Sequence, residues 1–300
     1  MTDAPPPADP HAYAKAARQR LERDVRALDY TRHWRTNPAG LKDAEDFIAL
    51  ELGSLGLRVE RHLFSWREHQ FHNVIGTRDG TDPSRPWIVA GAHFDTTEHT
   101  PGADDNASGV AAMLEIARRL QGEEFPATVQ FVGFNLEEHQ QWTPPFSRFG
   151  SKAYVRWLTD QVARVDGAFV LEMVGCTEEH QRVPVTARLF RKVSTRGDFV
   201  AAIADGNSRH LLHAMERANA GLLPMETLSV PFKGFVVPDT RRSDNARFWD
   251  ADYPAIMVTD TANLRNHRYH KTSDTCDTLD FVFMEKVVTI VTGAMRELAR

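Results

Sequence analysis

Cysteine is scarce in this 300-residue sequence: the chain has two, Cys176 and Cys276, and no Cys-x-x-Cys spacing. A structural zinc site built from thiolates and a redox pair of neighbouring cysteines are therefore excluded. The spacing alone leaves open whether the two cysteines form a disulfide. Any metal bound by this chain must be held by histidine and carboxylate side chains.

Long hydrophobic runs and an excess of basic residues are also missing. No stretch approaches the roughly 20 apolar residues of a membrane span. The 36 Lys and Arg are outnumbered by 41 Asp and Glu and are scattered along the chain, so we expect neither nucleic acid nor a membrane as a partner. The first ten residues contain four prolines and no Lys or Arg, which predicts a flexible tail over residues 1–10 and no signal peptide. We therefore expect a cytoplasmic protein.

The composition, with 42% hydrophobic and 26% charged residues, is that of a globular protein. Short apolar runs alternate with helical periodicity, without repeats or a linker, which predicts a single domain over residues 11–300. Such alternation predicts an α/β fold with helices on both faces of a mostly parallel sheet. The predicted strands are residues 57–66, 72–76, 87–92, 128–134, 167–171, 199–204 and 255–259. The predicted helices cover residues 21–28, 44–55, 110–117, 151–158, 208–220 and 284–291.

Histidines and carboxylates follow the ends of several predicted strands. Because ligand sites of open α/β sheets form at the carboxyl ends of the strands, we expect these side chains to meet at one edge of the sheet. Each of them alone is weak evidence, since paired acids usually form a solvated surface. Their shared placement is more informative. The residues are His93, Asp95, Asp104, Asp105, Glu137, Glu138, Glu172 and His270.

Carboxylates crowded at one site repel one another and resist burial unless cations neutralise them. Asp105, Glu138 and Glu172 supply three negative charges. A bridging hydroxide would add a fourth, which matches the charge of two Zn²⁺ ions. Histidine and carboxylate ligands without sulfur are typical of catalytic zinc, which keeps positions open for water and substrate. The sequence therefore predicts a catalytic centre with two zinc ions.

Five short motifs, in this order, resemble the co-catalytic di-zinc aminopeptidases of metallopeptidase family 28. The resemblance spans about residues 73–280, which is most of the chain. It implies a single-domain, three-layer αβα sandwich with a mixed, mostly parallel central sheet. The motifs are residues 91–95 (GAHFD), 102–109 (GADDNASG), 134–138 (FNLEE), 171–175 (LEMVG) and 269–270 (YH) with Asp274.

The family resemblance assigns a role to each predicted metal ligand. Asp105 is expected to bridge the two zinc ions. One ion is expected to be held also by His93 and Glu172, and the other by Glu138 and His270.

Three further acidic residues have implied roles around these ligands. Glu137 is expected to be the general base, which takes a proton from the attacking water and passes it to the leaving amine. Asp95 is expected to accept the second ring N–H of His93 and so fix its orientation. Asp104 is expected to support its loop rather than bind metal. Tyr269 is expected either to donate a hydrogen bond to the developing oxyanion or only to pack beside the neighbouring histidine.

The resemblance implies a zinc-dependent exopeptidase, most directly an aminopeptidase that hydrolyses N-terminal residues from peptide or aminoacyl substrates by means of a metal-bridging hydroxide. One alternative is a glutaminyl-cyclase-like acyltransferase with one zinc, and another is a catalytically silent binding relative. A carboxypeptidase or dipeptidase is a closer alternative, in which Arg241 and Arg242 would clamp a substrate carboxylate. The preferred N-terminal residue, the oligomeric state and the filling of both metal sites stay open.

Two features depart from the common family pattern. Glu172 stands where most members have aspartate, which extends the carboxylate by ~1.5 Å and resembles a bacterial subset with a Leu-Glu-Met motif. Residues 139–149 form a longer connection than in compact aminopeptidases, and they contain Trp142 and Phe146. This segment is expected either to line a pocket for an apolar side chain or only to cover the end of the sheet.

Overall fold

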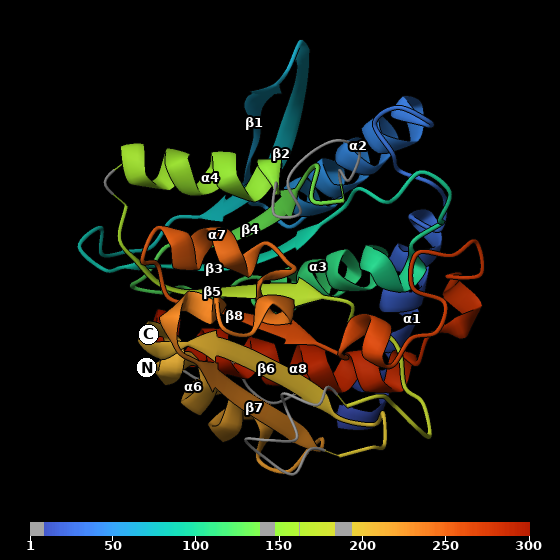
Figure 1. The fold of residues 1–300 in the computed structure, drawn as a ribbon. Coiled ribbons are helices and arrows are strands. Elements are labelled where there is room, and N and C mark those ends of the chain that lie inside the picture. The colour runs from blue at the N-terminus through green and yellow to red at the C-terminus, as the bar shows by residue number, and fades with distance from the viewer. Residues whose placement is uncertain (1–8, 139–147, 162, 184–193) are drawn as a thin grey trace.

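The computed structural model describes residues 9–138, 148–161, 163–183 and 194–300 as three layers, with an eight-stranded sheet between two layers of helices (Figure 1). The strand order is β1-β2-β4-β3-β5-β8-β6-β7. The strands are β1 Arg58–Trp66, β2 His69–Arg78, β3 Trp87–His93, β4 Val129–Phe134, β5 Val165–Glu172, β6 Val200–Asp205, β7 Met225–Val230 and β8 Ala255–Thr259. The helices are α1 Pro10–Ala27, α2 Pro38–Ser54, α3 Gly109–Arg119, α4 Phe149–Asp160, α6 Arg209–Asn219, α7 Asn245–Asp250 and α8 Phe281–Ala299.

The centre of the sheet is parallel and its flanks are antiparallel. Strands β4, β3, β5 and β8 run in the same direction, whereas the β1–β2 hairpin and the β6–β7 pair each join this centre through an antiparallel contact. The mixed, mostly parallel αβα sandwich expected from the sequence is therefore confirmed. The carboxyl ends of the four parallel strands meet at one edge, where a ligand site is expected.

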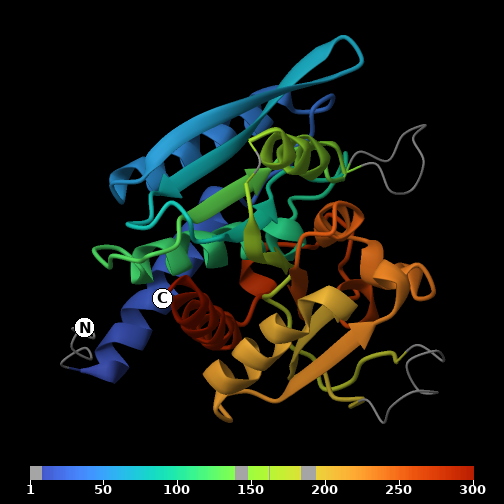
Figure 2. The same cartoon turned by 90° about the vertical axis from the view of Figure 1, so that its left-hand side faces the viewer.

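Alternate residues of the central strands enter two different cores because successive side chains point to opposite faces of a sheet. Ile88, Ala90 and Ala92 of β3 belong to the larger core, which also contains residues of α1, α2, α3, α6 and α8. Val89 belongs to the smaller core with residues of α4 and α7. The first and last helices, α1 and α8, pack against each other (Figure 2). Both faces of the sheet centre are thus buried, as its continuous apolar strands require.

Three elements were not expected from the sequence. Strand β7 mixes apolar and polar residues, is mostly half-buried and lies at the edge of the sheet, so its sequence lacks a buried-strand pattern. Helix α7 is only six residues long, too short for a clear period. Residues Ala103–Ser108, expected as a loop, form a kinked helical segment, η1, in which Asp105 and Asn106 have non-helical backbone angles and which leads directly into α3.

The structure also bears on what was expected of the N-terminal residues, of the two cysteines and of membrane-spanning helices. Asp9 accepts hydrogen bonds from the backbone of His11 and Ala12 and caps α1, which begins at Pro10, so the last residue of the expected tail is helical. Cys176 and Cys276 are buried and not bonded to each other. Among the described residues, no helix is both long and apolar enough to cross a membrane.

Candidate active site

The five predicted ligands come from five separate segments and meet at the carboxyl edge of the sheet. Each segment follows or ends one of the parallel strands, including the kinked segment η1, which lies between β3 and α3. His93 ends β3, Asp105 lies in η1, Glu138 follows β4, Glu172 ends β5 and His270 lies in the loop after β8. All are buried except His270, which is partly exposed.

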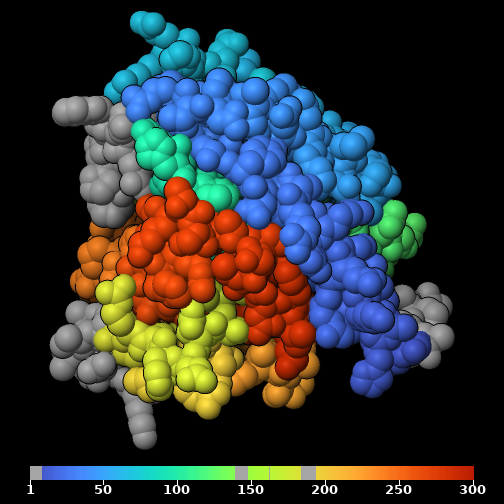
Figure 3. All heavy atoms as spheres, turned by 90° about the vertical axis from the view of Figure 1, so that its right-hand side faces the viewer, coloured from blue at the N-terminus to red at the C-terminus, as the bar shows by residue number. Residues whose placement is uncertain are grey.

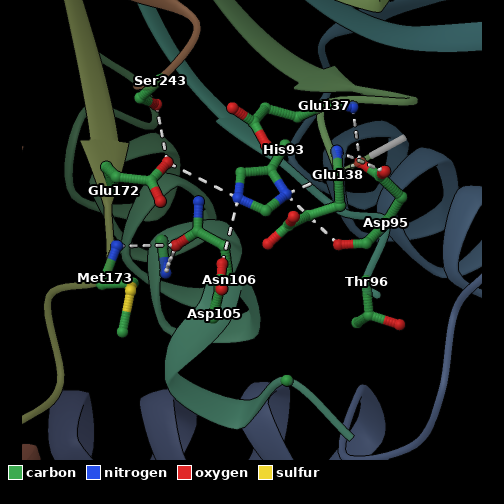
Figure 4. A network of polar contacts seen from close by, with 12 residues as sticks. His93, Asp95, Thr96, Asp105, Asn106, Glu137, Glu138, Glu172, Met173 and Ser243 are labelled. Carbon is green, nitrogen blue, oxygen red and sulfur yellow. Dashed lines mark hydrogen bonds and ion pairs between the residues drawn. The ribbon is translucent and has the colours of Figure 1, made fainter. Parts of the chain in front are cut away.

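These side chains form two groups that share Asp105. His93 Nε2 lies 3.3 Å from Asp105 Oδ1 and 3.5 Å from Glu172 Oε2 (Figure 4). His270 Nε2 lies 3.1 Å from Asp105 Oδ2 and 2.7 Å from Glu138 Oε1. In each group one ligand atom per residue lies within 4.8 Å of the others. Two groups of side chains that could each hold a cation therefore lie next to each other and share one carboxylate.

The donor atoms of this centre fit zinc. His93 Nε2 and both carboxylate oxygens of Asp105 are buried, and within the described part of the chain none of them makes a hydrogen bond of good geometry. Buried polar atoms without hydrogen bonds are costly, so a cation between them would remove that cost. Two imidazoles and three carboxylates without sulfur form a donor set that catalytic zinc accepts.

In the metal-free protein, bound protons offset part of the negative charge of the ligand carboxylates. Burial lowers the pKa of His270, but Glu138 and Asp105 outweigh this effect and raise it to about 11. Burial and the charge of Asp105 raise the pKa of Glu138 to about 7. Burial raises the pKa of Asp105, yet its contacts with His270 and His93 hold it far below its usual value. The metal-free centre is therefore protonated on its histidines and ionised at its bridging carboxylate at neutral pH.

We expect metal-free protein to lose stability as the pH rises from about 5 to about 9. The pKa of His270 is about 11 in the folded chain against 6.5 as an ordinary value, so its contribution is complete below the lower value and lost toward the higher one. The pKa of Glu138 is likewise raised from 4.5 to about 7, so stability also falls between those values. Bound zinc requires deprotonated ligands, which should reverse the trend.

Calorimetric Tm values at several pH values, with a chelator and with excess zinc, check this expectation. A metal-free Tm that rises with pH over this range would contradict the protonation states given for His270 and Glu138.

Glu137 lies beside the ligands without belonging to either shared group. Its carboxylate is 8% exposed, and its Oε1 lies 2.8 Å from Nε of the buried Arg148. Burial raises the pKa of Glu137 well above its usual value, although Arg148 opposes this shift. Glu137, His93 and Glu138 place one ligand atom each within 4.8 Å of one another. A carboxylate with raised basicity therefore faces the candidate metal centre.

Asp95 contacts His93 through both its main chain and its carboxylate, and it makes further contacts that were not expected. The backbone carbonyl of Asp95 lies 3.2 Å from His93 Nδ1, whereas its carboxylate oxygen is 3.5 Å away. The carboxylate also accepts hydrogen bonds from the backbone N–H groups of Glu137 (3.0 Å) and Glu138 (2.9 Å). Asp95 thus orients one ligand through its main chain and fixes the segment of the base and a second ligand through its side chain.

Asp104 points away from the centre, as expected. Its two carboxylate oxygens accept hydrogen bonds from Gly175 N (3.0 Å) and Asn266 Nδ2 (2.7 Å). Asn106, which the sequence motif contains without a predicted role, joins η1 to β5: its Nδ2 donates to Leu171 O at 2.9 Å and its Oδ1 accepts from Met173 N at 3.0 Å (Figure 4). Both residues hold the loops of the ligands in place.

Sequence patterns missed two residues just before α7. The hydroxyl of Ser243 donates a 2.6 Å hydrogen bond to Glu172 Oε2, which orients that carboxylate. Asp244 is fully buried next to it, and burial raises its pKa to about 6. Neither residue follows a strand, so the search at strand ends could not find them.

A mostly apolar pocket of about 220 Å³ adjoins the metal centre. It lies against the β8-β6-β7 part of the sheet, and Glu172 lines both the pocket and the metal centre. Tyr269 stacks on His270 with ring centroids 3.7 Å apart and also lines the pocket. The apolar wall consists of Val183, Phe199, Ala201, Ile203, Leu228, Val237, Met257, Ala262 and Leu264.

The two arginines considered as a carboxylate clamp have different surroundings. Arg241 is buried and donates to Asp250 Oδ1 at 2.6 Å and to the carbonyl of Lys233. Arg242 lines the pocket and donates to the hydroxyl of Tyr269 at 2.9 Å. A clamp formed by both arginines is therefore wrong, and only Arg242 faces the site. Residues 139–147, which include most of the segment after Glu138, lie outside the described residues.

Comparison with known proteins identifies the family. The sequence matches the profile of Peptidase family M28 over residues 73–295. The uncharacterized protein YfbL of Escherichia coli (strain K12) is 34% identical over 295 residues, which cover 91% of this chain and 86% of YfbL. The chain therefore belongs to peptidase family M28, and the resemblance seen in its motifs is confirmed.

Solved structures agree with this assignment. The aminopeptidase from Aneurinibacillus sp. strain AM-1 is similar with a TM-score of 0.57 and 26% sequence identity, over 77% of this chain and 48% of that chain. Glutaminyl cyclase from Porphyromonas gingivalis is similar with a TM-score of 0.70 and 18% identity, over 95% of this chain and 98% of that chain. The second likeness shows a shared fold alone.

Proposed function

We propose that this protein is an aminopeptidase with two zinc ions per chain. The observation that carries the proposal is the pair of ligand groups that share Asp105, with the raised-pKa carboxylate of Glu137 beside them. His93 and Glu172 would hold one ion together with Asp105, and Glu138 and His270 the other. Membership of a peptidase family and the similarity to an aminopeptidase support the reaction class.

Glu137, Asp95 and Tyr269 have separate roles in the proposed hydrolysis. Bound zinc supplies a Lewis acid that activates water and polarises the scissile carbonyl. Glu137 takes the proton of the attacking water at its carboxylate and delivers it to the amide nitrogen that leaves. Asp95 keeps this carboxylate in place through the Glu137 N–H. Tyr269, whose oxygen accepts from Arg242, has its own O–H proton available for the developing oxyanion.

The position of the pocket supports the proposal that the N-terminal end of a peptide enters. Glu172 lies at the junction of the metal centre and the pocket, so an N-terminal amine near this carboxylate places the first side chain in the apolar cavity. A volume of about 220 Å³ accommodates a large aliphatic or aromatic side chain. We therefore propose peptides with an apolar N-terminal residue as substrates.

Hydrolysis of a free and an N-acetylated form of the same Leu-initiated peptide tests this proposal. The zinc-loaded protein is expected to release leucine from the free peptide only, because acetylation removes the cationic amine. Equal cleavage of both forms, or cleavage from the carboxyl end, would contradict an aminopeptidase. Cyclisation of an N-terminal glutamine without release of amino acids from any peptide would favour the one-zinc acyltransferase instead.

Filling the pocket should change specificity more than catalysis. Ile203 of β6 lines the cavity, and Ile203→Trp should lower kcat/KM for N-terminal leucine or phenylalanine by roughly 10- to 200-fold. The same variant should act on N-terminal alanine within a few-fold of wild type, since a methyl group needs little of the cavity. Steady-state kinetics on both substrates measure the ratio. An equal loss on both would place the substrate side chain elsewhere.

A further inference from the structure

A fully buried arginine, Arg32, lies in the connection between α1 and α2. Its main chain pairs with Thr96: Arg32 N donates to Thr96 Oγ1 at 2.9 Å, and Thr96 N donates to Arg32 O at 3.0 Å. Its guanidinium group donates to backbone carbonyl groups. These are Phe94 at 2.7 Å, Tyr30 at 2.9 Å, Pro101 at 2.7 Å, Gly102 at 3.0 Å and Leu28. Within the described part of the chain, none of these guanidinium hydrogen bonds is made to a carboxylate.

The bonded carbonyl groups belong to two segments that carry predicted metal ligands. Phe94 follows His93, a ligand of one metal group. Pro101 and Gly102 directly precede η1, which contains the bridging ligand Asp105. The guanidinium group of Arg32 therefore joins the segment of His93 to the segment of Asp105. Among the described strands, no pairing connects these two segments.

The other side of η1 is held by the carboxyl group of Asp274. The two carboxylate oxygens of Asp274 accept hydrogen bonds from Asp104 N at 3.0 Å and from Asp105 N at 3.1 Å. Figure 3 shows the N-terminal part of the chain, in blue, lying against the C-terminal part, in red. The backbone around the bridging ligand is thus fixed through its carbonyl groups by Arg32 and through its N–H groups by Asp274.

The charge of Arg32 also suits this position. Burial lowers its pKa to about 10, so the group is still a cation at neutral pH, and Asp95, Asp274 and Asp105 act in the opposite direction. A buried cation is costly unless hydrogen bonds and nearby negative charges offset the loss of hydration. Here five carbonyl groups and the acidic centre supply both.

We propose that Arg32 is a positioning residue that, together with Asp274, holds the segments of His93 and Asp105 in their ligating arrangement before metal binds. The inference rests on the metal centre of the proposed function and is independent of which bond the protein cleaves. Loss of Arg32 should therefore weaken metal binding beyond its effect on folding.

The zinc dissociation constants of wild type, Arg32→Gln and Arg32→Lys, measured by competition with a chromogenic chelator, test the proposal with Zn²⁺ alone. Both variants should bind zinc roughly 10- to 100-fold more weakly, the usual cost of removing a group that orients metal ligands. Arg118→Gln is the matched control, since Arg118 is a nearly buried arginine at the far end of α3 that pairs with Asp24 and Glu51. It should lower Tm without changing zinc affinity.

Zinc affinity equal to wild type in a folded Arg32 variant would overturn the proposal, and so would an equal loss of affinity in Arg118→Gln. Amide hydrogen exchange of metal-free wild type gives a second test that needs no variant. The N–H groups of Ala103, Asp104 and Asp105, all bonded to Asp274, should be protected before zinc is added. Exchange at the rate of an unfolded peptide, slowed only by zinc, would show that the metal orders this segment and would overturn the proposal. Failure of peptide hydrolysis alone would leave these binding results unchanged.

Discussion

Replacement of Glu137 by glutamine should abolish most turnover while leaving zinc in place. Glutamine has nearly the same shape but cannot accept the proton of the attacking water, so kcat should fall by roughly 10²- to 10⁴-fold, the range that a positioned general base contributes. Zinc content should stay at the wild-type level, because Glu137 belongs to neither of the ligand groups that share Asp105. Folding should also be retained, since burial favours a neutral side chain here and the glutamine amide oxygen can still accept from Arg148.

The measurement combines kcat on a Leu-initiated peptide with zinc content by elemental mass spectrometry. Glu68→Gln, in the exposed turn between β1 and β2, is the control for loss of a carboxylate and should behave like wild type. Activity of Glu137→Gln near the wild-type level would show that another group is the base. Loss of zinc along with activity would assign Glu137 to the metal ligands instead.

Replacement of Asp105 by asparagine should remove both zinc ions. Asp105 is the single residue present in both ligand groups, and each of its carboxylate oxygens faces a different histidine. An amide carries no negative charge to neutralise the cations, so both sites should lose affinity together. Activity should fall by more than roughly 10²- to 10³-fold, the loss caused by removing one oxyanion-stabilising donor, because all metal assistance disappears.

Asp104→Asn is the matched control for this experiment. Asp104 is adjacent in sequence and equally buried, but its oxygens accept hydrogen bonds from Gly175 and Asn266 rather than facing the histidines. Burial raises the pKa of Asp104 well above its usual value, so loss of its charge is tolerated there, although asparagine keeps only one of the two accepted hydrogen bonds. Asp104→Asn should keep its zinc. Loss of zinc in this variant but not in Asp105→Asn would show that Asp104, and not Asp105, is the bridging ligand.

The fold and the ligand groups could be predicted because they depend on patterns that a strand imposes on the chain. The apolar run before His93 marks a strand buried on both faces, and its carboxyl end is where a ligand site of such a sheet forms. The convergence of Glu138, Glu172 and His270 follows from the same rule applied to the neighbouring strands. Strand β7 and helix α7 were missed because an edge strand and a single short helix need no long apolar pattern.

The supporting contacts could not be predicted because they depend on where atoms lie rather than on residue type. Asp95 meets His93 through its main chain, and no sequence pattern distinguishes a carbonyl contact from a carboxylate contact. Ser243 reaches Glu172 from a segment that follows no strand. Arg32 donates hydrogen bonds to backbone carbonyl groups. Every residue possesses such a group, so the sequence does not identify its partners. The apolar pocket combines side chains from four strands and becomes visible only once they are packed.

Stepwise addition of Zn²⁺ to metal-free protein, with peptide hydrolysis followed at each step, tests the central claim most directly. The two ligand groups predict that activity on a free Leu-initiated peptide appears with the metal and reaches its maximum at about two zinc ions per chain. Maximal activity at one ion per chain with no further binding, or two bound ions without hydrolysis of any free peptide, would contradict a two-zinc aminopeptidase.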